Sequence, residues 1–285
     1  MFLVADVGST KADWIFYHPD NGTHEVAGVG VNPNLHTDAE MRTVIEAVCP
    51  EEVPQGKVDF VHYYGTGIWD HSRAERLEKI LRLNFPRAEV HVHHDLLGAA
   101  RAACRDEAGI ACIMGTGSNS CLYDGTKVVD NVTNLGWLLG DEGSGVDLGK
   151  RLIRAYSYRE LAPETRELFE ESTGYNKAAI GDALYGPGNP NRFLASFSPF
   201  IHENLATPCI RRLVVESFTE FVRRHVKKYE AAAELPINFI GSIAYHYEDI
   251  VHEVCAAEGL TCGRVAKKPI QALKDYHAAA HYPAP

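Results

Sequence analysis

The sequence predicts an α/β protein of two related halves, each built on a mixed five-stranded β-sheet with helices on its faces. Three observations predict this. Apolar runs of strand length alternate with segments of helical periodicity along most of the 285 residues. Each half opens with two strand-like runs joined by a turn of glycine, serine and threonine. The order of elements in the first half then returns in the second half, with insertions.

In the first half, three strand-like runs precede alternating helices and strands. The turn signal Asp20-Asn21-Gly22 separates the second run from the third. Thr37 and Glu40 form a capping box ahead of an apolar stripe at helical spacing, which predicts a helix there. The other expected elements are the strands Phe2–Ala5, Trp14–Tyr17, His24–Val29, Val58–Tyr64 and Glu89–His93 and the helices Ser72–Leu83 and Leu96–Cys104. Three meandering strands followed by right-handed crossovers give a mixed sheet.

The second half repeats this order around a long helical stretch. The stretch from Ser157 to Glu234 reads as largely helical, with an interruption at Gly186–Asn191. The other expected elements are the strands Ile110–Met114, Ser120–Tyr123, Lys127–Asn131, Ile237–Ile240 and Leu260–Val265 and the helices Val146–Tyr158, Tyr247–Ala257 and Ile270–Ala280. We therefore expect one lobe at 1–105, completed by a closing helix at 270–285, and a second lobe at 106–269 with a helical insertion at about 157–234.

Composition excludes several classes of protein. The formal net charge of −10 and the pI of about 5.8 disfavour binding to nucleic acid or to anionic lipid, so neither partner is expected. The apolar opening Met1–Ala5 is interrupted at once by Asp6, which does not fit a secretory leader. The seven cysteines are scattered and never form a Cys-x-x-Cys pair, which predicts free thiols in a reducing cytoplasm.

Two glycine-containing turns have the chemistry of phosphate binding. Asp6-Val7-Gly8-Ser9-Thr10-Lys11 joins the first two strands, and Gly115-Thr116-Gly117-Ser118-Asn119 joins the equivalent strands of the second half. Glycine lets successive backbone N–H groups face a phosphate, and the hydroxyls add donors. Asp6 at the end of a buried strand could orient Mg²⁺. The plain alternative is a pair of hairpin turns, but their equivalent positions favour a site where the two halves hold ATP across a cleft. The sequence patterns of P-loop and Rossmann proteins are absent.

Residues that could act in catalysis or bind a polyol ligand follow later in the sequence. Asp95 comes where the fifth strand ends, where a carboxylate can accept the proton of an attacking hydroxyl or can cap the next helix. The segment from Gly136 to Gly145 places Trp137 beside the acidic pair Asp141 and Glu142. Its four glycines make a poor helix and a poor strand, which suits a loop that presents carboxylates to a sugar. The alternative is a surface loop in which Asp141 caps the following helix.

These motifs resemble those of the N-acetylglucosamine kinases in the BadF/BadG/BcrA/BcrD ATPase group, within the sugar kinase, Hsp70 and actin (ASKHA) superfamily. The resemblance rests on the order of five segments: Asp6–Lys11 with Trp14, Asp95, Gly115–Asn119, Gly136–Gly145 and Phe239-Ile240-Gly241-Ser242. It implies an actin-like ATPase fold, in which two duplicated ribonuclease H-like domains surround an ATP cleft. The sequence departs from some relatives in three places. The segment Asn32-Pro33-Asn34 lacks their bulky ring, the stretch from Ser157 to Glu234 is shorter than in the eukaryotic enzymes, and the adenosine turn has one glycine where many members have two.

The resemblance also implies roles for individual residues. Asp95 would be the catalytic base that activates the 6-hydroxyl of an amino sugar. Asn119 and Asp141 would bind the sugar, with Asn32 as a further contact, and Gly241 with Ser242 would begin the adenosine-binding turn. The implied cofactors are ATP and Mg²⁺, the implied partner is N-acetylglucosamine or a related hexosamine, and a homodimer is an assembly that the sequence leaves open.

Three rival functions remain open from the sequence. His91 and His93 lie on one face of a strand, a spacing that can bind zinc in a metal-dependent hydrolase. Cys112 and Cys121 flank the second glycine turn, where an ATPase that activates a redox partner could hold a cluster, although both read as core residues of strands. A sugar-binding regulator without catalysis is the third.

Overall fold

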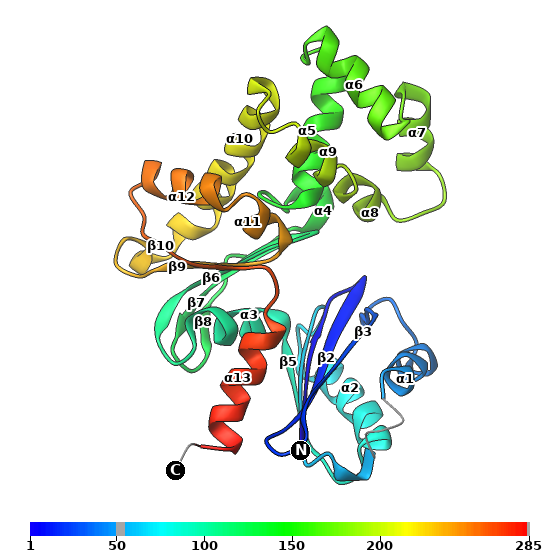
Figure 1. The fold of residues 1–285 in the computed structure, drawn as a ribbon, viewed down its shortest axis with the longest axis vertical. Helices are drawn as coiled ribbons and strands as arrows, with labels where there is room; N and C mark the ends of the chain where they lie inside the picture. The colour runs from blue at the N-terminus through cyan, green and yellow to red at the C-terminus, as the bar shows by residue number, and fades with distance from the viewer. Residues whose placement is uncertain (50–54, 284–285) are drawn as a thin grey trace. The chain divides into compact units, whose positions relative to one another are not determined.

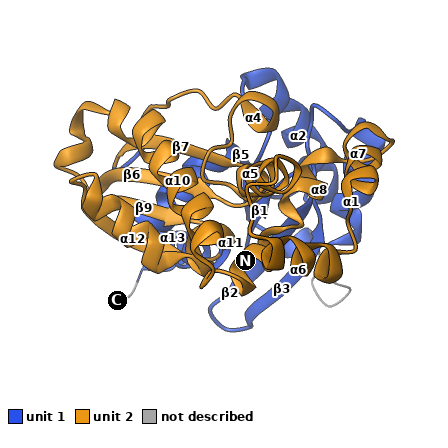
Figure 2. Cartoon of the chain, turned by 90° about the horizontal axis from the view of Figure 1, so that it is seen from above, with its two compact units in different colours: residues 1–106, 125–127, 268–285 blue, residues 107–124, 128–267 orange. Residues whose placement is uncertain are grey.

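The structure, a computed structural model, describes residues 1–49 and 55–283 (Figure 1). Two compact units make up the chain (Figure 2). Unit 1 contains Met1–Asp106, Gly125–Lys127 and Lys268–Pro285, and unit 2 contains Glu107–Asp124 and Val128–Lys267. The last two residues of the expected segment 270–285 lie outside the described residues. Among the described residues, no helix has both the length and the apolar character that crossing a membrane requires.

Unit 1 is built on a five-stranded mixed sheet in the order β3-β2-β1-β4-β5. Its strands are β1 (Phe2–Val7), β2 (Lys11–His18), β3 (Gly22–Val29), β4 (Phe60–Gly65) and β5 (Glu89–His94). The first three pair antiparallel, and β4 and β5 continue the sheet in parallel from β1. The predicted meander followed by crossovers is confirmed.

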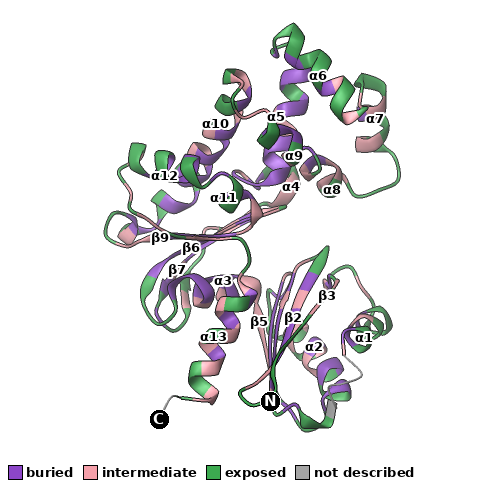
Figure 3. Cartoon of the chain, viewed as in Figure 1, coloured by how far each residue is buried: buried purple, intermediate pink, exposed green. Residues whose placement is uncertain are grey.

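Helices cover both faces of this sheet. They are α1 (Asp38–Ala47), α2 (His71–Asn84), α3 (Asp95–Cys104) and α13 (Ile270–His281), with a short 3₁₀ turn η1 (Gln55–Lys57). The predicted capping box is present at the start of α1, where Thr37 Oγ1 accepts from Glu40 N. Helices α1 and α2 contribute their buried apolar residues to one core cluster with Trp14. Figure 3 colours the chain by burial. Helices α3 and α13 pack together against the other face.

Unit 2 repeats the topology of unit 1. Its strands are β6 (Ala108–Met114), β7 (Ser118–Asp124), β8 (Val128–Asp130), β9 (Ile237–Ile240) and β10 (Cys262–Ala266). Read from its β8 edge, the order β8-β7-β6-β9-β10 matches that of unit 1, with the first three strands antiparallel and the last two parallel. The prediction of a duplicated α/β fold with two mixed five-stranded sheets is therefore confirmed.

The long helical stretch of unit 2 consists of many short helices. Proline stands in the first turn of α6, α8, α9 and α10, where its missing N–H needs no partner, so it starts each helix afresh. The helices of unit 2 are α4 (Gly136–Leu139), α5 (Gly145–Ser157), α6 (Pro163–Thr173), α7 (Lys177–Tyr185), α8 (Pro190–Ala195), α9 (Ser198–Glu203), α10 (Pro208–Arg224), η2 (Val226–Lys228), η3 (Glu230–Ala233), α11 (Ser242–His246) and α12 (Glu248–Ala257). The predicted interruption at Gly186–Asn191 is confirmed for residues 186–189, which separate α7 from α8, whereas Pro190 and Asn191 already belong to α8. The segment from Gly136 was expected to be a loop throughout, and the short helix α4 corrects this.

Candidate functional site

The first glycine turn joins β1 to β2 in unit 1. Gly8 N donates to the carbonyl oxygen of Lys11 at 3.0 Å, which closes the turn around Ser9 and Thr10. The side chains of Ser9, Thr10 and Lys11 are exposed. Gly30 lies directly behind the turn, because a Cβ atom there would overlap the backbone of Gly8 and Ser9. The turn is therefore supported from behind by Gly30 and exposes the hydroxyls of Ser9 and Thr10 on its open side, as phosphate binding requires.

Asn32 lies beside this turn. Its Nδ2 donates to Ser9 Oγ at 3.0 Å, and its Oδ1 accepts from the backbone and the side chain of Asn34 at 2.9 and 3.0 Å. The predicted sugar contact Asn32 and the predicted phosphate contact Ser9 are thus brought together within unit 1.

Asp6 and Asp95 lie close enough for their charges to interact. Burial raises the pKa of Asp6 to about 7, and the neighbouring carboxylates of Asp95 and Asp13 raise it further, while Lys268 and Lys11 oppose the shift. The residue keeps some exposed surface, but its carboxyl group is enclosed by protein. A divalent cation at Asp6 would relieve this repulsion, and Mg²⁺ is commonly held by one or two carboxylates together with phosphates. The residues present therefore fit a magnesium ion.

Asp95 is the first residue of α3, and His94 is the N-cap of that helix. The alternative reading of Asp95 as the cap is therefore wrong. His94 Nδ1 lies 3.1 Å from Leu96 N and 2.8 Å from Asp95 Oδ1. Burial lowers the pKa of His94, but the hydrogen bond and the charge of Asp95 outweigh burial, so its pKa is raised overall. Asp95 Oδ1 thus lies against the imidazole of His94, and the side chain of Asp95 keeps about a quarter of its surface exposed.

Trp69 is a candidate contact that the sequence reasoning missed. It follows the end of β4, its side chain is 67% exposed, and its ring centroid lies 6.1 Å from that of His94. Its Nε1 atom donates to Asn34 Oδ1 at 3.3 Å. The exposed ring of Trp69 thus lies beside Asn34 and beside His94, the residue before Asp95. It supplies an aromatic side chain near the segment 32–34, which has none. The sequence signal that could have identified Trp69 was its position shortly after a strand that ends in Gly65.

The second glycine turn lies between β6 and β7 in unit 2. Gly115 N donates to Gly117 O at 2.9 Å. The first amides of α5 donate back to this turn, Gly145 N to Gly115 O at 2.9 Å and Val146 N to Thr116 O at 3.1 Å. Gly241 has a φ of +133°, and a Cβ atom there would overlap the carbonyl oxygen of Met114. The second turn, the start of α5 and the predicted adenosine turn at Gly241 and Ser242 therefore converge in unit 2.

Asp141 fixes the loop from Gly136 to Gly145 against this turn. Its Oδ1 atom accepts from Ser118 N at 3.1 Å and from Asn134 Nδ2 at 2.8 Å, and the side chain is buried. Its φ of +61° is unusual for a residue other than glycine. Ser144 caps α5 instead, so the alternative reading of Asp141 as the helix cap is wrong. Sequence reasoning missed Asn134, whose Asn-Leu-Gly context gave only a turn signal.

The remaining predicted sugar contacts of unit 2 are partly engaged within the protein. Glu142 lies 3.2 Å from His225 Nε2 and 3.6 Å from Arg224 Nε. Asn119 Oδ1 accepts from Ser120 N at 2.9 Å. Trp137 and Glu142, with Asp147, line a cavity of about 450 Å³ beside Gly136. The loop therefore presents Trp137 to a cavity, while Glu142 is held by Arg224 and His225.

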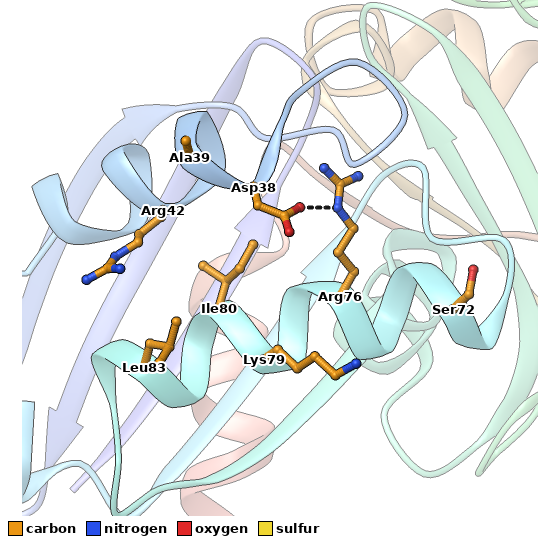
Figure 4. Close-up of a pocket in the computed structure, with 8 residues that line it drawn as sticks. All are labelled: Asp38, Ala39, Arg42, Ser72, Arg76, Lys79, Ile80 and Leu83. Atoms are coloured by element: carbon orange, nitrogen blue, oxygen red, sulfur yellow. Dashed lines mark hydrogen bonds and ion pairs between the residues drawn. The ribbon is translucent and has the colours of Figure 1, made fainter.

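A second cavity lies in unit 1 between α1 and α2 and has a volume of about 460 Å³ (Figure 4). The residues that line it are Asp38, Ala39, Arg42, Ser72, Arg76, Lys79, Ile80 and Leu83. Arg76 is bound to Asp38 and to the carbonyl oxygens of Pro33 and His36. These lining residues include none of the predicted site residues, so this cavity is separate from the glycine turn.

The chain is similar to several proteins of known structure. A solved structure of a candidate N-acetylglucosamine kinase from Porphyromonas gingivalis is 38% identical, with a TM-score of 0.92 over 99% of this chain and 100% of that one. A second candidate N-acetylglucosamine kinase, from Chromobacterium violaceum, is 17% identical, with a TM-score of 0.74 over 97% of this chain and 99% of that one. A glucokinase of the ROK family from Streptomyces griseus, solved with glucose and AMPPNP, is 16% identical, with a TM-score of 0.57 over 96% of this chain and 98% of that one.

None of the curated proteins compared with the chain matches it. The model of the BadF/BadG/BcrA/BcrD ATPase family matches residues 5–207, a range that contains both glycine turns and Asp95. The predicted resemblance is confirmed, and the chain belongs to the BadF/BadG/BcrA/BcrD ATPase family.

Proposed function

We propose that this protein is a kinase that transfers the γ-phosphate of ATP to the 6-hydroxyl of N-acetylglucosamine or a related amino sugar. The observation that carries the proposal is the pair of glycine turns at equivalent hairpins of a duplicated sheet, β1–β2 and β6–β7. The family is one of ATPases, and the relative from Porphyromonas gingivalis is a candidate N-acetylglucosamine kinase.

We assign the nucleotide to the two turns and to the segment after β9. Backbone amides and hydroxyls of Gly8, Ser9, Thr10 and Lys11 and of Gly115, Thr116, Gly117 and Ser118 are proposed to bind phosphates. Gly241 and Ser242 are proposed to begin the adenosine site. Support comes from the tight contact of Gly241 with Met114, next to the second turn.

Asp95 is proposed to accept the proton of the sugar hydroxyl as that oxygen attacks the γ-phosphorus. Such a base must lie within hydrogen-bond reach of the hydroxyl, and its exposed edge and the His94 contact suit that task. Asp6 is proposed to hold Mg²⁺, which neutralises charge on the phosphates. Most of the acceleration would come from alignment and charge stabilisation.

For the sugar we propose the contacts that the family resemblance implies. Asn32 in unit 1 and Asn119, Asp141 and Glu142 in unit 2 supply polar groups. The unit 2 loop adds Gly136 and the ring of Trp137. In unit 1 we add Trp69, whose exposed ring offers an apolar face to a pyranose. We expect Trp69→Ala to raise the KM for the sugar roughly tenfold and to leave kcat unchanged, because the ring would contribute about 1.5 kcal/mol of binding.

The decisive experiment is an ATP-consumption assay across a panel of sugars that includes N-acetylglucosamine, glucosamine, other hexosamines and a murein fragment. One sugar should raise ATP turnover sharply. Asp95→Asn should lower that turnover at least ~100-fold while ATP binding is kept, and Asp20→Asn, at an exposed carboxylate, serves as the matched control. Near-normal turnover in Asp95→Asn would remove Asp95 from the mechanism.

An ATPase that activates a redox partner is the second candidate. Cys112 and Cys121 have no exposed surface and lie in β6 and β7, as the sequence predicted for core residues, so this pair does not offer ligands to a cluster shared with another chain. ATP turnover that ignores every sugar but rises with a protein partner would favour the activator. Sugar binding without turnover would favour a regulator.

Three finer properties are proposed with the kinase: Mg²⁺ as the metal ion, a location in the cytoplasm, and a homodimer as the assembly. The scattered spacing of the seven cysteines, which form no Cys-x-x-Cys pair, supports the location. Light scattering at several protein concentrations would test the dimer.

A further inference from the structure

Four polar side chains of unit 1 form a chain of hydrogen bonds that ends at the first glycine turn. It begins on α2, where Arg73 Nε donates to Asn34 Oδ1. Asn34 Nδ2 then donates to Asn32 Oδ1 at 3.0 Å, and Asn32 Nδ2 donates to Ser9 Oγ, also at 3.0 Å. We call this chain of four side chains the Ser9 relay.

The partners of Asn34 fix which way its side-chain amide points. Its Oδ1 atom faces Arg73 Nε and Trp69 Nε1, and guanidinium and indole nitrogens can only donate. Its Nδ2 atom faces the carbonyl oxygen of Gly67 at 3.0 Å, which can only accept. The opposite orientation would pair donors with donors and acceptors with acceptors. Asn34 therefore turns its amide nitrogen toward Asn32.

The orientation of Asn32 is fixed by a second, independent contact. The backbone N–H of Asn34 donates to Asn32 Oδ1 at 2.9 Å, so the atom on that side of Asn32 must be its oxygen. The backbone around it is held from α2, because Arg76 donates to the carbonyl oxygens of Pro33 and His36 at 2.6 and 2.8 Å. Asn32 therefore presents its amide nitrogen, which can only donate, to Ser9 Oγ.

We propose that Asn34 is a positioning residue for phosphate binding, because the Ser9 relay makes the Ser9 hydroxyl a donor to a phosphate oxygen of ATP. The inference rests on the proposed function, which places a phosphate at the first glycine turn. A hydroxyl has one hydrogen and two lone pairs, so a Ser9 oxygen that accepts from Asn32 keeps its hydrogen for the ligand. Hydrogen bonds to a charged acceptor such as phosphate are the stronger ones. The second N–H of Asn32 Nδ2 remains for the proposed sugar contact.

Gly67 gives the two amides room to meet. Its φ is +76°, and a Cβ atom there would lie 2.4 Å from Asn32 Oδ1 and 2.6 Å from Asn34 Nδ2, the two atoms that bond to each other. Gly22 in the same unit has a φ of +75°, but a Cβ atom there would meet nothing within 4 Å. An alanine at either position has the same backbone strain, and only the one at position 67 disturbs the relay.

Asn34→Asp tests the relay by reversing its direction. A carboxylate can only accept, so it keeps the bond from Arg73 but turns an oxygen toward Asn32 Oδ1. The repulsion favours the flipped amide of Asn32, whose oxygen then takes the hydrogen of Ser9. We expect the Kd for AMPPNP with Mg²⁺, measured by calorimetry on the full chain, to rise at least about tenfold. Asn34 is exposed, so the variant should fold.

The control for the added charge is Asn21→Asp, at an exposed position of unit 1, which should leave this Kd unchanged. A Ser9→Ala background separates the relay from simple repulsion between the new carboxylate and the phosphates. In that background Asn34→Asp should cost little further affinity if it acts through the Ser9 hydroxyl, whereas repulsion would persist. Gly67→Ala should also weaken AMPPNP binding, and Gly22→Ala should not.

Binding and turnover can fail separately. A wild type that binds AMPPNP but consumes ATP with no sugar would defeat the kinase proposal and leave the binding test of the relay in force. Sugar-dependent turnover with an unchanged Kd in Asn34→Asp would overturn the relay alone. The relay would also be overturned by an equal loss of affinity with and without the Ser9 hydroxyl, by an equal loss in Gly67→Ala and Gly22→Ala, or by a wild type that does not bind AMPPNP.

Discussion

Replacing Asp6 with asparagine should stabilise the protein increasingly as the pH rises. The pKa of Asp6 is raised from 3.8 to about 7 by burial, so the folded protein keeps the proton over a range in which the unfolded chain has lost it. For an acid shifted upward, folding stability falls as the pH rises from about 4 to about 7. At about 1.4 kcal/mol per pKa unit, the full loss is about 4 kcal/mol above pH 7. Asparagine does not titrate and escapes this loss.

The measurement is the free energy of unfolding in urea at pH 5 and at pH 8. The advantage of Asp6→Asn over the wild type should grow by about 3 kcal/mol between these two values, since about two pH units of the titration lie between them. Trp14 is fully buried in unit 1, with its ring centroid 5.8 Å from that of Tyr63, and its fluorescence reports this unit in a background of Trp69→Phe and Trp137→Phe.

Asp20→Asn is the control, because this carboxylate is 86% exposed. An equal effect of Asp6→Asn at both pH values would refute the reasoning. It would mean that the carboxyl group of Asp6 is solvated in the folded protein and that burial does not disfavour its charge.

Two further substitutions test the packing of unit 2. Gly241→Ala should weaken ATP binding, measured by calorimetry, at least about tenfold, because a Cβ atom would displace Met114 and with it the second turn. The control is Gly259→Ala, because Gly259 also has a positive φ but a Cβ atom there meets open space. An equal loss of ATP affinity in both variants would contradict the reasoning. Asp147→Ala should lower the free energy of unfolding by about 1–3 kcal/mol, because it removes the acceptor of the buried Ser217 hydroxyl and one of the two carboxylates that pair with Arg151. Glu216→Ala breaks an exposed pair and should cost at most about 1 kcal/mol in the same urea titration, so comparable losses would count against this account.

The strands and helices were largely predictable because local patterns determine them. The capping box at Thr37 and Glu40 and the runs bounded by turns such as Asp20-Asn21-Gly22 act within a few residues, and the structure has them as expected. The duplication was visible because each half opens with the same hairpin chemistry. Prolines such as Pro163 and Pro190 carried the information on where the helical stretch divides.

The parts of the site that were missed depend on contacts between distant segments. Asn134 was passed over because its role is to bind Asp141 and the backbone of Ser118, and no spacing rule joins these positions. The caps were misassigned for a related reason. His94 and Ser144 accept the first amides of α3 and α5, and both compete locally with a neighbouring aspartate that is also a good cap.

The contact of His62 on β4 with His277 and His281 on α13 could not be predicted from the sequence. His91 and His93 attracted attention because they are two residues apart. The three rings that converge come from β4 and from a helix more than 200 residues later, where only the i, i+4 pair His277 and His281 could have been noticed. Tertiary packing alone brings His62 to them.

The division of unit 1 into Met1–Asp106 and Lys268–Pro285 has a consequence for synthesis on the ribosome. When the first 106 residues have emerged, the helix that packs on β1, β2 and α3 has not yet been translated. At 5–20 residues per second, translation of the intervening chain takes on the order of ten seconds. Throughout that time the nascent sheet presents Phe2 and its neighbours to water, so the N-terminal lobe completes its fold last although it is made first.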